Sequence, residues 1–522
     1  MKAERELRYA ILILALAGII FTSSCIQEEL PELPEEEIAF SYLRCSDYKL
    51  PEYAVSGNIY YVNNADPKVS DNNDGLSSSY VSGMHGPWAT IQKAAKTMTA
   101  GDITYIRAGT YKEANIQFRN SGTEDAPITL SAYGSPGSFE QVIIDGTGQP
   151  AYSIGIGLKE SQSNIIIQGL SIQKMPESGI VSDEYVSEHS KNIVIREIIV
   201  RNNGYAGLYL SALDGFKIDS VIAYGNGYDG ISIAGSENGN LYSKNGYIVK
   251  SQSYNNGAEP NAHGIAINQG HTIAICNCTA YRNTNHGFDV SDWPKGGKVS
   301  YNIAFEDSIS YDNGNAGFAA NSDSHHLLYL RNLAYGNKEW TGFIGYEGVG
   351  HVEYYHNVAI RNRYGGFWIE EPYAVYADPG DNTIILKNNI AYNNDLIDLY
   401  APGLVVEGNN YEVVATHNNW QVPDGQDFED FGNIAAAIGK TTYSPLDIDE
   451  LGEGSLSTNP GFIDGDSKIP DIHLTATSEM IDSGTMITIN EKSESYSETA
   501  PDIGAYEYFR INSSGFIPKH VS

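Results

Sequence analysis

The sequence predicts an all-β protein folded as a parallel β-helix, in which short strands stack coil upon coil. The first observation is a repeated unit, an asparagine followed closely by a glycine and a pair of apolar residues. It occurs at Asn203/Gly207, Asn226/Gly230, Asn256/Gly264, Asn283/Gly287, Asn313/Gly317, Asn337/Gly342 and Asn362/Gly366. The second is the uneven spacing of 23, 30, 27, 30, 24 and 25 residues between successive asparagines. Leucine-rich and helical repeats keep Leu or Ala at fixed offsets, so these units favour a β-helix with variable loops.

Composition is the third observation. The chain has 522 residues, 41% of them hydrophobic, with 53 Gly and 37 Tyr against 20 Pro. This balance, together with abundant Asn, favours many short strands and tight turns over long helices. The net charge of −33 repels nucleic acid and anionic membrane surfaces, so neither is expected as a partner.

Residues 1–24 have the pattern of a signal peptide. Basic residues precede an apolar run, Ala10 to Phe21, that is too short to span a bilayer comfortably. The small residues before Cys25 resemble a bacterial lipobox, in which the cysteine is lipidated; the alternative is a plain signal peptide that contains Cys25. We therefore expect a secreted protein, held at the cell surface or outer membrane by a lipid on Cys25 and touching the membrane only through that anchor.

An acidic, proline-punctuated tether is expected over residues 25–57. It resembles the acidic signal that sends some bacterial lipoproteins to the cell surface. Cys45 lies in the tether, whereas Cys276 and Cys278 are two apart on one predicted strand and are expected to share a face in the core. With no CxxC motif and no second cysteine pair, neither a zinc site nor a disulfide framework is expected.

Residues 58–150 are expected to form an N-terminal cap and the first coils. Residues 87–96 place apolar side chains at helical spacing behind Pro87, and a short helix there would cover the open edge of the first sheet. The β-helix repeats are expected over residues 151–420, with the repeated asparagines forming a ladder of side-chain hydrogen bonds along one turn. Residues 421–522 are expected to form an insertion, with one short helix near 434–438, followed by a capping segment.

Two columns of side chains follow from the repeat. In the pattern Gly-apolar-x-apolar the apolar residues point inward and x points outward. The outward column is Tyr209, Ser232, Ala266, Asp289, Ala319, Ile344 and Trp368. The column just before each glycine is Ala206, Asp229, His263, His286, Ala316, Thr341 and Gly365. Asp229, His263 and His286 are therefore expected on consecutive coils, with Asp289 beside them.

The segments HGIAIN, NTNHGFDV, DNGNAGFAANSD and LAYGN resemble the right-handed parallel β-helix of family 9 polysaccharide lyases, which are pectate and rhamnogalacturonan lyases. In that family aspartates bind a calcium ion that grips the substrate carboxylate, and a lysine removes the neighbouring proton. The resemblance places the first aspartate on His263, the paired aspartates on Asn285 and His286, and the last on Asp289. It places the lysine on Ala319.

These departures change the chemistry that the resemblance implies. Calcium prefers six to eight oxygen ligands, so Asp289, Asn285 and Asp229 predict at most a weak calcium site. An alanine cannot remove a proton. A histidine base is the alternative, because imidazole titrates near neutrality and similar NxxHGFxV coils occur in alginate epimerase and lyase β-helices. His286 and His263 are then the catalytic candidates, with Asp289 orienting or stabilising the imidazole.

Candidates for contact with a sugar polymer are Trp293, Lys295 and Trp368, which offer aromatic stacking and pairing with a carboxylate. Glu370 and Glu371 are candidates for a glycosidase carboxylate, although no partner at the required separation is evident.

Two classes of function remain open at this stage. The first is an enzyme acting on an acidic plant or algal polysaccharide, a lyase or epimerase, with a glycoside hydrolase as a variant. The second is a non-catalytic surface lipoprotein that binds glycan, with the histidines serving only as hydrogen-bonded turn residues. Ala319 favours the second class and the cluster of Asp229, His263, His286 and Asp289 favours the first. A monomer is expected in either case.

Overall fold

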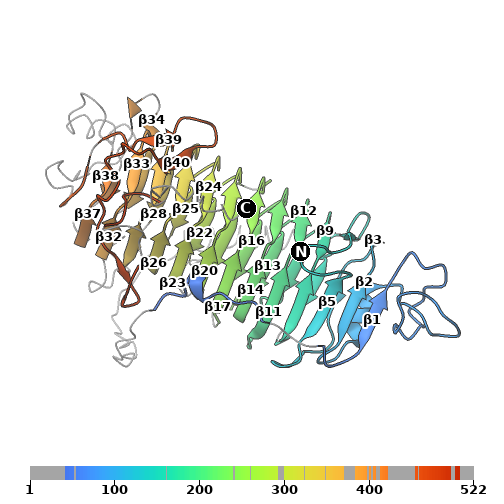
Figure 1. Cartoon of the computed structure of the whole chain (residues 1–522). Helices are drawn as coiled ribbons and strands as arrows, with labels where there is room; N and C mark the ends of the chain where they lie inside the picture. The colour runs from blue at the N-terminus through green and yellow to red at the C-terminus, as the bar shows by residue number, and fades with distance from the viewer. Residues whose placement is uncertain are drawn as a thin grey trace, which may run out of the picture. The chain divides into compact units, whose positions relative to one another are not determined.

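A computed structural model describes most of the chain between residues 41 and 505 (Figure 1). The described ranges are 41–51, 55–159, 161–238, 241–258, 260–291, 299–321, 324–346, 349–369, 383–396, 399–400, 404–406, 412–420, 453–456, 458–494 and 500–505. Residues 1–39 and 40–522 form separate units by their internal contacts, and everything below concerns the second unit. Among the described residues, no helix is both long and apolar enough to cross a membrane.

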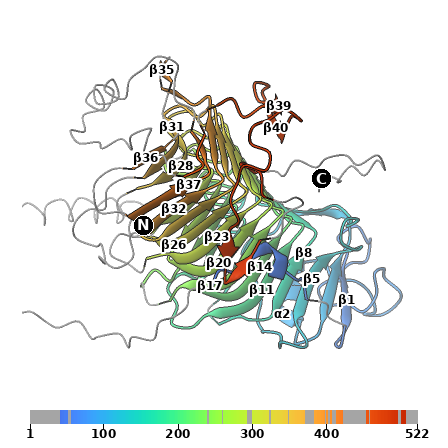
Figure 2. The same cartoon turned by 60° about the vertical axis from the view of Figure 1, so that its left-hand side comes forward.

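Three parallel sheets run the length of the described solenoid (Figures 1 and 2). Sheet I consists of β1 (Ile59–Val62), β2 (Ile103–Ile106), β5 (Ile128–Ala132), β8 (Ile165–Gln168), β11 (Ser190–Arg196), β14 (Leu213–Asp219), β17 (Ser243–Val249), β20 (Gly270–Cys276), β23 (Tyr301–Glu306), β26 (His325–Leu330), β29 (Val352–Tyr355), β32 (Thr383–Lys387) and β37 (Glu412–Thr416). Sheet II consists of β4 (Ile116–Gln117), β7 (Ile156–Leu158), β10 (Ile180–Ser182), β13 (Leu208–Ser211), β16 (Ile231–Ala234), β19 (Ile265–Asn268), β22 (Phe288–Ser291), β25 (Phe318–Ala320), β28 (Thr341–Gly345), β31 (Gly365–Ile369) and β36 (Leu404–Val406). Sheet III consists of β3 (Gly109–Tyr111), β6 (Val142–Asp145), β9 (Leu170–Gln173), β12 (Ile199–Arg201), β15 (Ile222–Tyr224), β18 (Gln252–Tyr254), β21 (Thr279–Tyr281), β24 (Ile309–Tyr311), β27 (Leu333–Tyr335), β30 (Val358–Ile360), β33 (Ile390–Tyr392) and β38 (Asn419–Trp420).

From β4 onward, each coil contributes one strand to each sheet in the order II, I, III. The coil of β19, β20 and β21 is followed by that of β22, β23 and β24, and each strand pairs in parallel with its counterpart on the next coil. This arrangement confirms the predicted parallel β-helix. It also places residues at equivalent points of successive coils next to one another, which positions the candidate site.

Stacked apolar side chains fill the space between the sheets. Phe288, Phe318, Phe343 and Phe367 from sheet II stack with centroid separations of 4.6, 4.9 and 4.7 Å. Rings from sheet I pack against them edge to face, as Phe305 does at 5.8 Å from Phe288. Burial of a side chain of this size contributes about 1.5–3 kcal/mol, so each coil stabilises its neighbours through the core.

An asparagine ladder runs along one turn, as predicted. The Nδ2 of Asn283 donates to Oδ1 of Asn313 at 3.1 Å, and Asn256 donates to Asn283 at 3.0 Å. The ladder extends through Asn203, Asn226, Asn256, Asn283, Asn313, Asn337, Asn362 and Asn394. Buried amides are therefore paired from coil to coil.

A second ladder, which we did not predict, lies at the start of the sheet III strands. Asn332, Asn357, Asn389 and Asn418 are buried and joined by Nδ2 to Oδ1 hydrogen bonds of 3.0 Å. The sequence contained a signal for it, because the first three precede the similar strands LAY, VAI and IAY.

The short helix α2 (Ile91–Thr97) confirms the predicted N-terminal helix. The side chain of Thr90 caps it by accepting a hydrogen bond from the backbone N–H of Lys93 at 3.1 Å. Its buried residues are Ile91, Ala94 and Ala95, and it lies against β1 and β4 in the first coils.

The prediction that no disulfide forms is wrong. Cys45, in the 3-10 helix η1 (Cys45–Asp47), is bonded to Cys276 at the end of β20. Asn277 adopts a left-handed conformation with φ of 52°, which turns the chain between the two cysteines. Cys276 therefore joins a cluster on the outer face of sheet I with Val249 and Ala274, whereas Cys278 is a free thiol in the core.

Part of the predicted tether is therefore packed against the β-helix. Tyr42 contacts Leu328 and Ile487 on the outside of sheet I, and Tyr48 donates its hydroxyl to Asp219 at 2.8 Å. The Arg44 guanidinium donates to Glu306 at 2.7 Å, so residues 41–48 are held by polar and apolar contacts as well as by the disulfide.

The C-terminal segment follows the outer faces of the last coils. It contains the antiparallel pairs β39 (Phe462–Asp464) with β40 (Asp471–Leu474) and β41 (Thr488–Ile489) with β42 (Lys492–Ser493); a further pair, β34 (Asp395–Leu396) with β35 (Leu399–Tyr400), precedes it. Ile472, Met480 and Ile503 pack against sheet III. The predicted helix at 434–438 lies outside the described residues.

Candidate active site

The outward column of sheet II has the register that the sequence predicts. Cα partners on successive strands are Tyr209, Ser232, Ala266, Asp289, Ala319, Ile344 and Trp368. The neighbours of Asp289 within β22, Phe288 and Val290, are buried in the core. Alternation along the strand thus directs Asp289 to the other side of the sheet, the outer wall.

The residues that precede the glycines also stack. The backbone N–H of Gly230 donates to the carbonyl of His263, and that of Gly264 donates to the carbonyl of His286, at 3.1 and 3.0 Å. A Cβ at Gly264 would lie 2.5 Å from the carbonyl oxygen of Gly287, so this close approach of the coils requires glycine. Asp229, His263 and His286 consequently occupy the same position on three consecutive coils.

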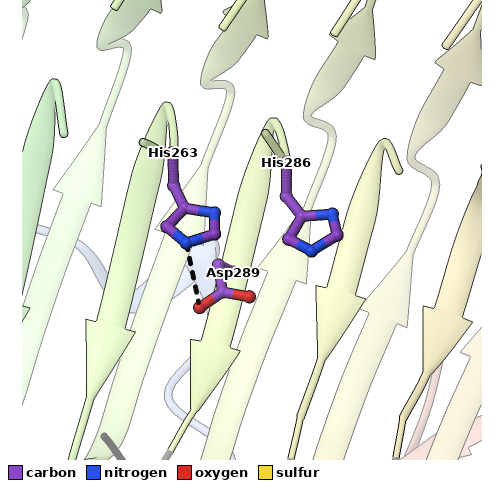
Figure 3. A group of neighbouring side chains, drawn as sticks. All are labelled: His263, His286 and Asp289. Carbon is purple, nitrogen blue, oxygen red and sulfur yellow. Dashed lines mark ion pairs between the residues drawn. The ribbon is translucent and has the colours of Figure 1, made fainter. Parts of the chain in front are cut away.

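His263, His286 and Asp289 form one cluster on the outer wall (Figure 3). The two imidazole rings are stacked, with centroids 5.3 Å apart and planes at 11°. Nε2 of His263 lies 4.0 Å from Oδ2 of Asp289, and one potential ligand atom from each of the three side chains lies within 4.8 Å of the others. The sequence prediction that these three residues meet is confirmed by this geometry.

Hydrogen bonds fix three side chains to the next coil. Oδ1 of Asp229 accepts from the backbone N–H of His263 at 2.8 Å, and Nδ1 of His286 accepts from the backbone N–H of Ala316 at 3.2 Å. Oδ1 of Asp289 accepts from Nδ2 of Asn321 at 2.5 Å. Asp229 and His286 therefore do satisfy turn N–H groups, which is the structural role considered above, but each keeps a further polar atom for other contacts.

The bond from Ala316 determines the tautomer of His286. An imidazole nitrogen that accepts a hydrogen bond carries no proton, so a neutral His286 carries its ring proton on Nε2. At Nε2 the ring is then a hydrogen-bond donor and cannot remove a proton from a substrate. Nδ1 of His263, in contrast, is buried and has no hydrogen-bond partner within the described chain.

Burial dominates the electrostatics of the cluster. It raises the pKa of Asp289 to about 7, against hydrogen bonds from Ser291 and Asn321 that lower it. Burial also raises the pKa of Asp229 to about 6, partly offset by His263. Burial, followed by the proximity of His263, lowers the pKa of His286 well below its ordinary value, and burial lowers that of His263. Near neutral pH the histidines are thus uncharged, and Asp289 is close to its titration point.

The residues do not fit a calcium ion. Two imidazole nitrogens stand where oxygen ligands would be needed, and Oδ1 of Asp229 is bonded to the backbone of the next coil. Asn285, which is half-buried, has a single side-chain oxygen to offer. A transition metal would accept imidazole ligands. It would, however, need the lone pair of His286 Nε2, which carries the proton while Nδ1 accepts from Ala316.

An apolar cluster continues the wall beyond His286. Ala316, Ala319, Ile344 and Trp368 are buried together, with Trp340 and Tyr346 at the edge. The Tyr346 ring lies 5.8 Å from that of His286; the sequence pattern gave no signal for this contact, because Tyr346 follows β28 outside the two columns. Trp368 as a sugar contact stays a prediction, and its ring is largely covered by these neighbours.

Several predicted site residues fall outside the described ranges. Trp293 and Lys295, expected to contact substrate, belong to this group, as do Glu370, Glu371 and the lipidation site Cys25. The structure describes no side-chain position for any of them.

Comparison with known proteins identifies the family. The model of the Pel9A-like right-handed β-helix region matches residues 60–419. The chain is 27% identical to the uncharacterized protein YwoF of Bacillus subtilis over 341 residues, which are 54% of this chain and 69% of that protein. It is 23% identical to pectate lyase L of Dickeya dadantii, over 83% of this chain and 89% of the lyase.

The crystal structure of pectate lyase Pel9A superposes with a TM-score of 0.49 and 19% identity, covering 88% of this chain and 98% of the other. The right-handed parallel β-helix predicted from the sequence is confirmed by the family match. Because that match spans most of the chain, the protein belongs to the Pel9A-like right-handed β-helix family.

Proposed function

We propose that the protein is an extracellular carbohydrate-active enzyme that cleaves a uronic-acid polysaccharide by β-elimination at a divergent site. The observation that carries this proposal is the cluster of His263, His286 and Asp289 on the outer wall. Perturbed titratable groups gathered in this way are typical of catalytic sites. Family membership and the similarity to pectate lyase L support the reaction class.

Asp289 is the base in this proposal. Its carboxylate takes the proton at C5 of the uronic acid, the C–H electron pair forms the C4–C5 double bond, and the C4–O4 bond breaks. The departing O4 takes a proton from water, so the reaction needs no redox partner. The raised pKa of Asp289 makes it a stronger base than an ordinary carboxylate.

The histidines bind and orient the substrate. The Nε2–H of His286 donates a hydrogen bond to the carboxyl group attached to C5, where negative charge develops as the proton leaves. His263, 4.0 Å from Asp289 and stacked on His286, positions both groups. We therefore replace the expectation that His286 is the base with the role of donor.

A non-catalytic glycan-binding protein is the second candidate. Ala319, where the family resemblance places the lysine, is buried with Ile344 and Trp368 in an apolar cluster. That part of the wall supplies no titratable group from these residues. Binding without turnover would leave Asp289 as a contact only.

Export and lipid anchoring at Cys25 belong to the same proposal. The signal-like residues 1–24 and the disulfide between Cys45 and Cys276 support it, because disulfides persist mainly in oxidising compartments. Radiolabelled palmitate should label the wild-type protein and leave Cys25→Ala unlabelled; equal labelling of both would contradict anchoring at this cysteine.

Incubation with polygalacturonate, pectin, rhamnogalacturonan and alginate tests the activity. We expect slow release of unsaturated chain ends from at least one polymer, measured by ultraviolet absorbance, and the same rate after addition of EDTA. Rapid cleavage that EDTA abolishes would contradict the metal-free site. Binding of a polymer without any release of unsaturated ends would favour the second candidate.

A further inference from the structure

The charges of the carboxyl groups and histidines in the candidate site affect which substrate it accepts. Asp229 and Asp289 are both buried there, and the charge of Asp289 adds to the cost of charging Asp229. Among the described residues no lysine or arginine forms an ion pair with either carboxyl group, and Nε2 of His263 lies 4.0 Å from Oδ2 of Asp289. Both histidines are uncharged near neutral pH because burial lowers their pKa values.

A free uronate would bring a third carboxylate into this surrounding. Buried charges require a cation or several hydrogen bonds, and the cluster does not fit a calcium ion that would bridge them. Within the described part of the site, His286 offers a neutral donor, Nε2–H, because the bond from Ala316 occupies Nδ1. A neutral donor matches a neutral carbonyl acceptor better than it matches an anion.

We propose that the site takes uronic acid residues whose carboxyl group is uncharged, as in a methyl ester, in preference to free uronates. This inference rests on the proposed function and specifies its substrate. An ester also suits a site without a metal. Removal of the C5 proton from an ester forms a singly charged enolate, whereas removal from a carboxylate forms a dianion that needs a cation.

The elimination then balances within the site. The C5 proton passes to Asp289, the electron pair forms the C4–C5 double bond, and O4 leaves with a proton from water. The ester group is not cleaved. Its carbonyl oxygen accepts from His286 Nε2–H throughout and receives the developing charge.

Matched polymers test the preference. A highly methyl-esterified galacturonan and the same preparation after alkaline removal of the esters are incubated with the full chain in EDTA, and the release of unsaturated ends is followed. Repulsion between two charges at about 5 Å in a partly buried site corresponds to on the order of a hundredfold in rate. We expect the esterified polymer to react at least about tenfold faster. An equal or faster reaction of the de-esterified polymer overturns the proposal.

Binding measurements test the preference for esters independently of the proposed activity. If neither polymer is cleaved, elimination fails as the function, and the preference is still measured by calorimetry with methyl-esterified and free oligogalacturonides. The wild type should bind the ester more tightly, and Asp289→Asn should reduce the difference by weakening the rejection of the acid. Asp312→Asn, which removes an acid paired with Arg282 outside the cluster, should bind as the wild type does. Equal binding of ester and acid by the wild type overturns the inference.

Discussion

The hydrogen bond between the backbone N–H of Ala316 and Nδ1 of His286 sets the chemistry of the candidate site. It leaves the ring proton of the neutral imidazole on Nε2 and makes His286 a donor there. The sequence pattern predicted the position of His286, because the residue before each glycine stacks from coil to coil. It did not predict the tautomer, since the donor is contributed by a residue 30 positions later.

Replacement of His286 tests this donor. His286→Ala removes the only group assigned to stabilise the developing charge, and removal of one such donor typically costs 10²–10³-fold, so we expect the rate to fall by about a hundredfold or more. His473→Ala is the control, because His473 is an exposed imidazole paired with Asp471 away from the cluster. An unchanged rate of elimination in His286→Ala would exclude the imidazole from the reaction.

Asp289 links the site to the pH dependence of stability. Burial raises its pKa from the usual 3.8 to about 7 in the folded protein. The folded state therefore binds the proton more tightly than the unfolded state, and the stability contributed by this group falls as pH rises between about 4 and 7. Asp289→Asn removes the effect, which amounts to a few kcal/mol at most, on the order of 4.

Thermal unfolding at different pH values measures this contribution of Asp289 to stability. We expect Asp289→Asn to be more stable than the wild type at pH 8 and nearly equal to it at pH 4. His263 and His286, whose pKa values are lowered, change stability in the opposite direction as pH falls below about 6.5, but they are common to both proteins and largely cancel in the difference. If the wild type and Asp289→Asn were equally stable at both pH 4 and pH 8, burial would not raise the pKa of Asp289.

Sequence reasoning succeeded best for the strands. A glycine lies at or beside the first residue of the sheet II strands from β7 to β31, and alternation then fixes which residues face outward, so the column from Tyr209 to Trp368 had the correct register. The second asparagine ladder could have been found from the repeated Asn before sheet III strands. The repeat pattern that predicts the first ladder includes a glycine, which the turn of the second ladder lacks.

The first ladder makes a prediction about stability. Oδ1 of Asn283 accepts from both the backbone N–H and Nδ2 of Asn256, and its Nδ2 donates to Ser253 and Asn313. Asn283→Ala leaves several of these buried groups unsatisfied at about 1–3 kcal/mol each, so we expect a loss of roughly 3–5 kcal/mol in the free energy of unfolding by urea. Asn315→Ala, a half-buried position on the next coil, should change stability by less than about 0.5 kcal/mol. Similar losses in the two variants would contradict a special role for the ladder.

Across the whole molecule, distant segments meet in ways that no local pattern reveals. Cys45 and Cys276 are 231 residues apart in the sequence. The spacing of Cys276 and Cys278 predicted instead that both thiols lie side by side in the core. A turn at Asn277 sends the two neighbouring cysteines to opposite sides of the sheet. The disulfide could not be inferred without knowing that residues 41–48 run along the outside of sheet I.

The disulfide should stabilise the unit that it closes. Cross-links over long loops typically contribute about 2–4 kcal/mol, so Cys276→Ser is expected to lower the melting temperature. Cys45→Ser and the double variant should lower it by the same amount, because all three remove one bond. A double variant that is markedly less stable than either single variant would show that the cysteines act independently.

The rate of unsaturated-end formation as a function of pH in EDTA, compared between the wild type and Asp289→Asn, tests the central claim most directly. With Asp289 as the base of a metal-free site, the wild-type rate should rise through about pH 7 as the carboxyl group loses its proton, and the variant should show no elimination at any pH. A wild type that is active only with added calcium, or an Asp289→Asn variant that keeps the wild-type rate and pH profile, would contradict it.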